Sequence, residues 1–252
     1  MGKRRYLLVL IVLLTTLLMM IATGYCAVKG EEKKDWNISF LGTFQVPAQL
    51  EIVDGKEVII EVLKMSEKMG EQNTPTKEKL SANTVSPEAI TAFFEENKIG
   101  LYELALKNNG SYNVALLFAG KLPADMNADG VAFLADLKGI DKKQQEEIHT
   151  LLQKQINDMY AQNPEMKDIF EIEILEFYPF EQLTNKNAEM ISIGASVAVR
   201  AFKLIQPGAC KVYFINKNSE LYVFGIINSG QDRKLWDNMS KEMLSNARWS
   251  WL

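Results

Sequence analysis

Apolar and polar side chains alternate in several stretches of the chain, and this alternation predicts β-strands. Phe170, Ile172 and Ile174 alternate with Glu171 and Glu173, which is typical of a strand with one buried face and one solvated face. Alternation or a run of β-branched residues predicts further strands over 36–44, 50–53, 57–63 and 190–204.

Three turn signals predict how neighbouring strands connect. Asn109-Gly110 readily supplies the positive φ angles of a tight hairpin, and Asp54-Gly55 is a second signal of this kind. A third polar turn spans 216–219. The predicted connections join 101–107 to 111–119, 50–53 to 57–63, and 211–215 to 221–227.

Three stretches with apolar residues at helical spacing predict helices. The first covers 86–97 and opens with Ser-Pro-Glu, an N-cap followed by proline in the first turn. Asp141 with Gln144 and Ser229 with Asp232 resemble the capping patterns that open the other two. Hairpins and alternating strands interrupted by about three helices predict an α+β domain, an antiparallel sheet with the helices packed on it. The predicted buried stripes are Ile90, Phe93 and Phe94; Ile148, Leu151, Leu152, Ile156, Met159 and Tyr160; and Leu235, Trp236, Met239, Met243 and Leu244.

The sheet is preceded by an N-terminal hydrophobic helix, predicted over 1–27 as a signal peptide or a membrane anchor. Three basic residues come first, followed by 15 uncharged residues over 7–21 and then by Ala22 and Gly24, spaced for signal peptidase. With 22–24 added, the stretch reaches 18 residues, the lower limit for an uncleaved span. Both alternatives keep the basic cluster in the cytoplasm and predict an extracytoplasmic location for the rest.

The remaining sequence predicts a single domain after a short linker. Residues 28–35 form a charged tether, and 36–252 are long enough for one sizeable core. Within this domain, 66–85 is polar and contains one proline. A structureless stretch of this length is uncommon in a compact domain, so it is either a functional flap or a tolerated insertion. We favour the insertion.

The net charge and the two cysteines limit the ligands and the reactions that we expect of this protein. The formal net charge is −4, and loss of 1–27 removes three of the 28 basic residues and none of the 32 acidic ones, which leaves −7. Such a domain repels phosphate backbones, so nucleic acid is excluded as the expected ligand. Cys210 is predicted to be a small buried hydrophobe, and it can pair with Cys26 only if cleavage leaves Cys26 in place.

The C-terminal hairpin and helix carry a family resemblance. A hairpin over 211–227 leads into a closing helix with Trp236 near its start and Met-Leu-Ser at 243–245 near its end. Residues 44–47 read Phe-Gln-Val-Pro, an aromatic-x-x-Pro pattern. These features resemble the C-terminal strand-strand-helix and the first strand pair of PsbP-like domains. The resemblance implies an exported α/β/α protein that binds or stabilises a membrane-associated complex without catalysis, and it transfers no functional residue.

One stretch has the ligand spacing of a calcium loop. Asp125, Asn127 and Asp129 stand at its first, third and fifth positions, Gly130 at the sixth and Asp136 at the twelfth. Oxygen donors converging from one tight loop suit a hard cation such as Ca²⁺. The alternative is a polar turn that joins a strand to a helical stretch, because Asn, Asp and Gly are ordinary turn formers. We favour the turn.

Catalytic signatures are weak. Glu171, Glu173 and Glu176 could be offered as paired carboxylates for glycoside hydrolysis, but on a strand they form its solvated face. His149, the only histidine, is predicted to lie at a helix surface or boundary without partners for a metal site. The sequence contains no G-x-S-x-G, H-E-x-x-H, P-loop or C-x-x-C motif.

Tryptophans at the end of the chain raise the question of a contact surface. Trp249 and Trp251 are either an exposed patch for a partner or membrane, or they pack back on the sheet and lock the last helix. Packing is favoured. The sequence therefore predicts an exported or membrane-tethered, non-enzymatic accessory module with a membrane-associated protein complex as partner. The alternatives are an extracytoplasmic hydrolase with an unrecognised site and a calcium-stabilised structural protein.

Overall fold

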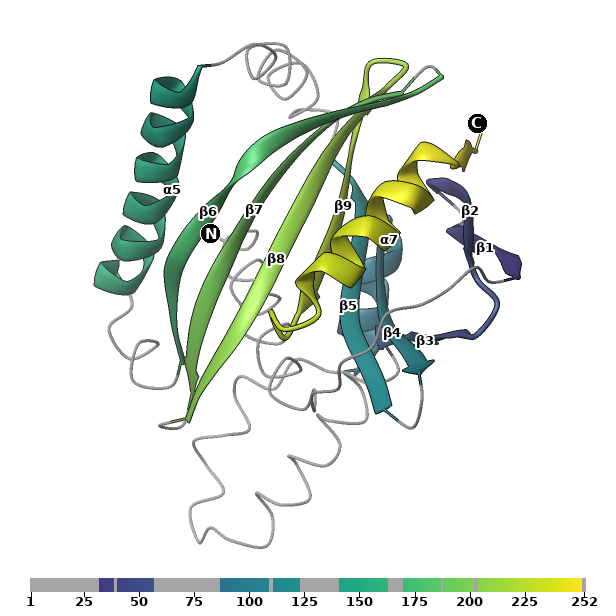
Figure 1. Cartoon of the computed structure of the whole chain (residues 1–252), viewed down its shortest axis with the longest axis horizontal. Coiled ribbons are helices and arrows are strands. Elements are labelled where there is room, and N and C mark those ends of the chain that lie inside the picture. The colour runs from purple at the N-terminus through teal and green to yellow at the C-terminus, as the bar shows by residue number, and fades with distance from the viewer. Residues whose placement is uncertain are drawn as a thin grey trace, which may run out of the picture.

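A computed structural model describes residues 32–38, 40–56, 87–108, 111–122, 141–162, 170–186, 188–201 and 204–250. Two antiparallel sheets make up most of this part of the chain (Figure 1). The large sheet has seven strands in the order β3-β4-β5-β9-β8-β7-β6, and the small one has three in the order β1-β2-β10. The strands are β1 (Lys33–Ile38), β2 (Gly42–Pro47), β3 (Leu50–Asp54), β4 (Ile99–Asn108), β5 (Ser111–Lys121), β6 (Phe170–Asn185), β7 (Ala188–Ala201), β8 (Leu204–Lys217), β9 (Glu220–Asn228) and β10 (Arg248–Trp249), and the helices are α3 (Pro87–Glu96), α5 (Lys142–Gln162) and α7 (Arg233–Ser245).

The predicted α+β class with antiparallel strands and three helices is confirmed for the described residues. The hydrophobic segment over 1–27 lies outside them. Among the helices that the structure describes, none combines the length and the apolar character needed to span a bilayer. β1 begins at Lys33, inside the stretch predicted as a charged tether.

Two of the predicted hairpins are confirmed. β4 and β5 pair from Ile99↔Gly120 to Asn108↔Ser111, so their connection has two residues. β8 and β9 meet at Lys217↔Glu220 across Asn218 and Ser219. These two residues have φ angles of 51° and 62°. Positive φ at both central positions gives the turn a twist that matches the strands it joins.

Two predictions about the first strands are wrong. The stretch over 36–44 is a hairpin rather than one strand, because the chain turns between β1 and β2, where the Leu41 amide donates to the Ile38 carbonyl at 2.9 Å. Gly55 and Lys56 are helical, so Asp54-Gly55 is not a hairpin turn. The strand predicted over 57–63 lies outside the described residues.

The helix starts differ in how well the sequence predicts them. At α5 the Gln144 amide donates to Asp141 Oδ1 and the Asp141 amide to Gln144 Oε1, both at 2.9 Å, which confirms the capping box. At α7 the pattern predicted from Ser229 is wrong. The N-cap is Asp232, whose side chain makes no capping hydrogen bond, and α7 begins at Arg233.

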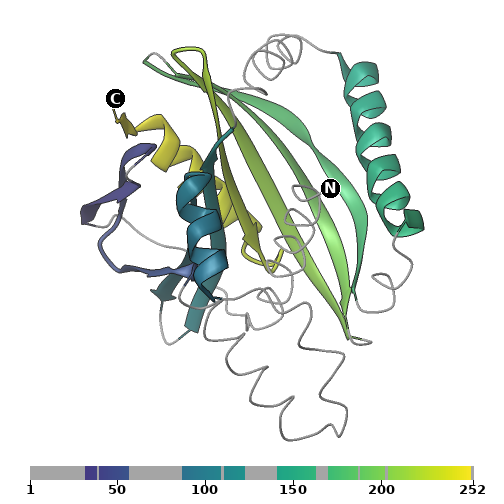
Figure 2. The same ribbon diagram turned by 180° about the vertical axis from the view of Figure 1, so that it is seen from behind.

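The main core lies where α7 packs against both sheets. Figure 2 shows α3 on the face of the large sheet away from α7. On the inner face, Trp236 and Phe224 are completely buried, and Phe44 of β2 packs on Phe224 with ring centroids 5.8 Å apart. The remaining core is aliphatic and aromatic and includes Ile38, Leu41, Val46, Leu104, Leu117, Tyr213, Ile215, Ile226, Met243, Leu244 and Trp249.

At Gly42 the backbone of β2 lies in close contact with the C-terminal strand β10. This contact predicts that an added methyl group at position 42 lowers the stability of the protein. A Cβ at Gly42, whose φ is 155°, would lie 2.6 Å from the carbonyl oxygen of Arg248 and 2.9 Å from Cα of Trp249. Gly42→Ala is expected to separate β10 from β2 and lower the free energy of unfolding by about 1–3 kcal/mol, the range for overpacking. Urea denaturation followed by tryptophan fluorescence measures this.

Gly120→Ala is the matched control. The nearest atom to a Cβ at Gly120 is 3.7 Å away, so this substitution is expected to leave stability nearly unchanged. Equal loss of stability in both variants would contradict the proposed contact.

Candidate functional site

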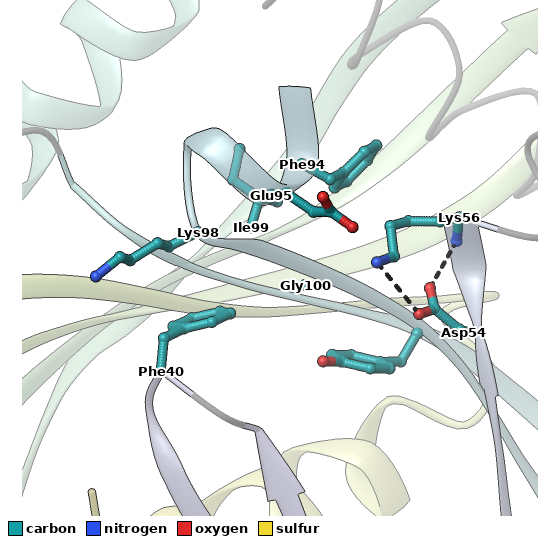
Figure 3. Close-up of a pocket in the computed structure, with 9 residues that line it drawn as sticks. Phe40, Asp54, Lys56, Phe94, Glu95, Lys98, Ile99 and Gly100 are labelled. Atoms are coloured by element: carbon teal, nitrogen blue, oxygen red, sulfur yellow. Dashed lines mark hydrogen bonds and ion pairs between the residues drawn. The ribbon is translucent and has the colours of Figure 1, made fainter. Parts of the chain in front are cut away.

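A cavity of about 380 Å³ lies where the small sheet meets one end of the large sheet (Figure 3). Four segments surround it: the β1–β2 turn, the end of β3, the last turn of α3 and the start of β4. The cavity is therefore built from residues far apart in the sequence. Its lining residues are Phe40, Asp54, Lys56, Phe94, Glu95, Lys98, Ile99, Gly100 and Tyr102.

A tight turn brings α3 and β4 to the same cavity. Lys98 has a φ of 49°, the left-handed conformation that ends many helices, and its amide donates to the Glu95 carbonyl at 3.2 Å. The Lys98 carbonyl in turn accepts the Lys121 amide of β5 at 3.3 Å. Because the helix passes into the strand within two residues, Glu95 and Gly100 both line the cavity.

Aromatic rings form much of the wall. The Tyr102 ring packs edge-on against Trp36 of β1, with centroids 4.9 Å apart and an interplanar angle of 88°. Gly100 allows this ring to lie against the backbone, because a Cβ there would be 2.7 Å from the Tyr102 ring. Burial, with a smaller effect of Asp54, raises the pKa of Tyr102, which keeps its hydroxyl neutral at physiological pH.

The charged residues that line the cavity are two carboxylates and two amines, and they are not evenly placed. Asp54 accepts the Lys56 amide at 2.9 Å, and its other carboxylate oxygen lies 3.6 Å from the Lys56 ammonium. Figure 3 shows Glu95 turned toward this pair and Lys98 directed away from it. The described lining therefore holds two carboxylates and two ammonium groups. Because Lys98 points away from Asp54 and Glu95, these two carboxylates share only the Lys56 ammonium on their side of the cavity (Figure 3).

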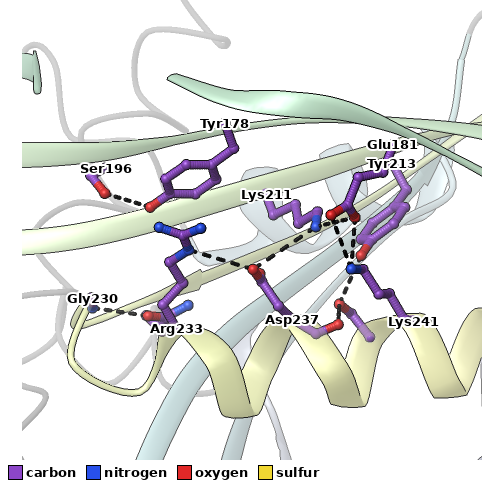
Figure 4. A network of polar contacts seen from close by, with 11 residues as sticks. Tyr178, Glu181, Ser196, Lys211, Tyr213, Gly230, Arg233, Asp237 and Lys241 are labelled. Atoms are coloured by element: carbon purple, nitrogen blue, oxygen red, sulfur yellow. Dashed lines mark hydrogen bonds and ion pairs between the residues drawn. The ribbon is translucent and has the colours of Figure 1, made fainter. Parts of the chain in front are cut away.

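A second polar cluster joins α7 to the large sheet (Figure 4). Glu181 of β6 accepts hydrogen bonds from Lys211 of β8 at 2.7 Å and from Lys241 of α7 at 3.0 Å. The side chain of Lys211 is only 4% exposed, and its ammonium also lies 3.9 Å from Asp237 of α7. A bulge in β6 between Tyr178 and Glu181 shifts the strand register at this point.

The same cluster continues to the start of α7. The Arg233 guanidinium stacks on the Tyr178 ring, 3.6 Å from its centroid, and lies 3.5 Å from the Asp237 carboxylate. The hydroxyls of Tyr178 and Ser196 are 2.5 Å apart. Because nearly every charged group in the cluster is paired across the α7–sheet interface, we assign it to the attachment of α7 rather than to a ligand.

Most residues singled out by sequence fall outside the described part of the chain. These are the calcium-loop residues Asp125, Asn127, Asp129 and Asp136, the polar stretch 66–85, Cys26, and Trp251. The predictions made for them stay predictions. Within the described ranges, no group of three or more His, Cys, Asp or Glu side chains is placed to hold a metal ion.

The tryptophan of β10 is described and is buried. Trp249 is 6% exposed and packs edge-on against Phe44, with ring centroids 6.1 Å apart. Of the two alternatives for this residue, packing is the one the structure shows. Its neighbour Arg248 pairs with Asp35 of β1, so the end of the chain is held by both apolar and ionic contacts.

Other candidates for chemistry lie apart from the cavity. Glu171, Glu173 and Glu176 follow one another on β6, at the far edge of the large sheet. His149 stacks on Phe177 with a centroid distance of 3.9 Å, and burial lowers its pKa against the opposing effect of Glu146. Burial raises the pKa of the Cys210 thiol to about 12, which makes it unreactive at neutral pH.

Sequence reasoning missed the cavity because no local motif marks it. Phe94 was correctly assigned to a buried helix face, whereas Asp54 was assigned to a hairpin turn and is instead the last residue of β3. The missing information was that the turn carrying Phe40 packs beside the α3–β4 corner. Only the arrangement of the two sheets brings these segments together.

Comparisons with known proteins give structural likenesses at low identity. No family model matches the chain, and no curated protein matches it. The Ran-binding protein Mog1p of Saccharomyces cerevisiae superposes with a TM-score of 0.36 and 10% identity, over 87% of this chain and 96% of the yeast chain. A cyanobacterial PsbP from Synechocystis gives a TM-score of 0.36 and 8% identity, over 92% of this chain and 99% of its own. The second of these structures is a PsbP, the kind of protein that the C-terminal hairpin and helix resemble.

The Glu181 cluster predicts a pH dependence of stability. Burial opposes the charged form of Glu181, but hydrogen bonds from Lys211 and Lys241 outweigh it and hold the pKa below its ordinary value of 4.5. A lowered folded-state pKa stabilises the fold above pH 4.5, and this stability is lost as the pH falls through the folded-state pKa. Because Glu181 is partly exposed, Glu181→Gln is expected to cost about 1–2 kcal/mol at neutral pH.

Urea denaturation across the acid range tests this expectation. The difference in stability between the native protein and Glu181→Gln should shrink as the pH falls below 4.5. Glu173→Gln, an exposed glutamate on the same strand, is the matched control and should leave the pH profile unchanged. A constant difference between native protein and Glu181→Gln at every pH would refute the role of the carboxylate charge.

Proposed function

We propose that this chain is an exported or membrane-tethered accessory module that binds a partner protein through the cavity and catalyses no reaction. The observation that carries the proposal is the composition of the cavity: aromatic walls, two carboxylates and, among the residues that the structure describes there, no serine, cysteine or histidine. Such a site can bind a ligand through shape complementarity and through charge. Its one amine beside a carboxylate, that of Lys56, is engaged in an ion pair with Asp54 rather than placed to attack a substrate.

A basic side chain of the partner suits this cavity best. Aromatic faces and carboxylates together bind an ammonium or guanidinium group through cation–π and ionic contacts. Lys56 neutralises one carboxylate, and a cation from the partner balances the other. The formal net charge of −4 for the whole chain also attracts a basic segment over longer distances.

Binding of a guanidinium group in the cavity is tested with a small arginine derivative. Nα-acetyl-arginine methylamide is titrated into the ¹⁵N-labelled domain, and the expected amide shift changes cluster at 54–56 and 95–102. The citrulline analogue has the same shape without the charge and is expected to bind at least about tenfold more weakly, the equivalent of a lost charged contact. Equal binding of the two probes would rule out charge recognition.

Two substitutions in α3 test which carboxylate binds the positive charge of the probe. Glu95→Gln removes one inward carboxylate and is expected to weaken binding of the arginine probe about three- to tenfold. Glu96→Gln changes the next residue of α3, which is exposed and does not line the cavity, and it should leave binding unchanged. Equal effects of both substitutions would indicate a general response to net charge and would contradict a defined site.

Export is proposed from the hydrophobic segment alone. Its basic start, apolar middle and small residues support transfer of the domain across a membrane. Cell fractionation with N-terminal sequencing is expected to find the domain outside the cytosol, starting at Tyr25 if cleavage follows Gly24, or at the membrane if the segment is retained. A cytosolic protein that keeps its hydrophobic segment would contradict both alternatives.

A further inference from the structure

We propose that the partner segment whose basic side chain fills the cavity binds as an additional strand along the edge of β3 that no described strand pairs with. This inference rests on the proposed function and adds the mode of binding: backbone hydrogen bonds to an edge strand, with one side chain held in the cavity beside it. The occupant is an extended, basic segment of a partner protein.

The edge of β3 is open in the described part of the chain. β3 is the last strand of the large sheet on this side and pairs with β4 from Leu50↔Leu106 to Asp54↔Tyr102. Its register shows no bulge, and its sequence contains no proline. The Lys34 ammonium hydrogen-bonds the Leu50 carbonyl at 2.6 Å, at the end of the strand away from the cavity. Unpaired strand edges are ready sites for strand addition.

The opposite edge of the same sheet, formed by β6, is protected against strand addition, and the edge of β3 differs from it in this respect. β6 has two register shifts, between Ile174 and Glu176 and between Tyr178 and Glu181, and the second includes Pro179. The Ile172 amide of β6 donates to the Tyr160 hydroxyl of α5 at 2.7 Å. Bulges, proline and a covering helix are the means by which proteins block edge pairing. None of them is found at β3 among the described residues.

The open edge leads directly to the cavity. β3 ends at Asp54, which lines the cavity and pairs across the sheet with Tyr102, another lining residue. A peptide strand of about five residues, at roughly 3.3 Å per residue, covers the length of β3. Because alternate side chains share a face, a residue placed beside Asp54 directs its side chain to the cavity, and its neighbours lie on the other face.

The surface around the edge is acidic and partly apolar. Glu51 is exposed, and Val53 is 44% exposed, which is high for a large apolar side chain on a strand. Glu103 of β4 lies directly opposite Val53. A strand with a basic residue on one face and apolar side chains on the other complements this surface in charge and in contact area.

The experiment compares three ligands for the intact domain. The first is the arginine probe described above, and the second is an acetylated hexapeptide amide of sequence Thr-Val-Thr-Val-Arg-Thr. The third is the same hexapeptide with N-methyl groups on the alternate amides that would face β3, which abolishes those hydrogen bonds and keeps every side chain. Affinities are measured by NMR titration. The intact hexapeptide is expected to bind at least about tenfold more tightly than the arginine probe, and N-methylation should remove this gain.

Protein variants separate the edge from the cavity. Val53→Lys places a positive charge on the exposed edge strand and is expected to weaken the hexapeptide and leave the arginine probe unaffected. Leu175→Lys introduces the same charge at the protected edge, where the native side chain is 58% exposed, and should affect neither ligand.

Each outcome decides the proposal. If the hexapeptide and its N-methyl form bind equally, or if the hexapeptide gains nothing over the arginine probe, strand addition is overturned and the cavity remains a side-chain site. If the arginine probe itself fails to bind, the proposed function fails and the strand mode fails with it.

Discussion

The packing of α7 between the two sheets is the interaction on which the rest of the structure depends. Trp236 is fully buried there, and the Asn185 amide of β6 donates to the carbonyls of Leu244 and Ala247 at the end of the helix, both at 2.9 Å. The chain then adds β10 to β2, which fixes the small sheet. Because the β1–β2 turn of that sheet carries Phe40, the wall of the cavity is positioned by the C-terminal helix. Burial of large apolar side chains, at about 25 cal/mol per Å², is the main source of this stability.

Polar contacts define where α7 lies on the sheet. Apolar packing alone tolerates small shifts, whereas Lys211 is nearly buried and has to keep its carboxylate partners. The bulge that precedes Glu181 and the charged groups of α7 therefore select one alignment of the helix. Apolar burial thus supplies stability, and the paired network sets the alignment of the helix.

Local signals in the sequence predicted the elements well and their assembly poorly. Asp141 with Gln144, and the polar turn before Glu220, act over a few residues, so their capping box and hairpin could be read directly. The hairpin within 36–44 was missed because Phe40 and Leu41 of its turn are apolar and the one glycine nearby, Gly42, was read as part of the strand. The Ser229 pattern failed because α7 begins at Arg233, with Asp232 as its N-cap, so Ser229 lies outside the first turn of the helix. Local sequence patterns could not predict the cavity, because its walls come from four separate segments whose contact depends on the packing of α7.

The open edge and the cavity lie side by side, and this gives the account a spatial test. Hydrogen–deuterium exchange of the intact domain, with and without the arginine hexapeptide, reports which backbone amides the ligand protects. Protection confined to β3, the α3–β4 corner and the adjoining start of β4 is the result expected. Protection centred on β6 and α5, with β3 exchanging at its free rate, would contradict the account.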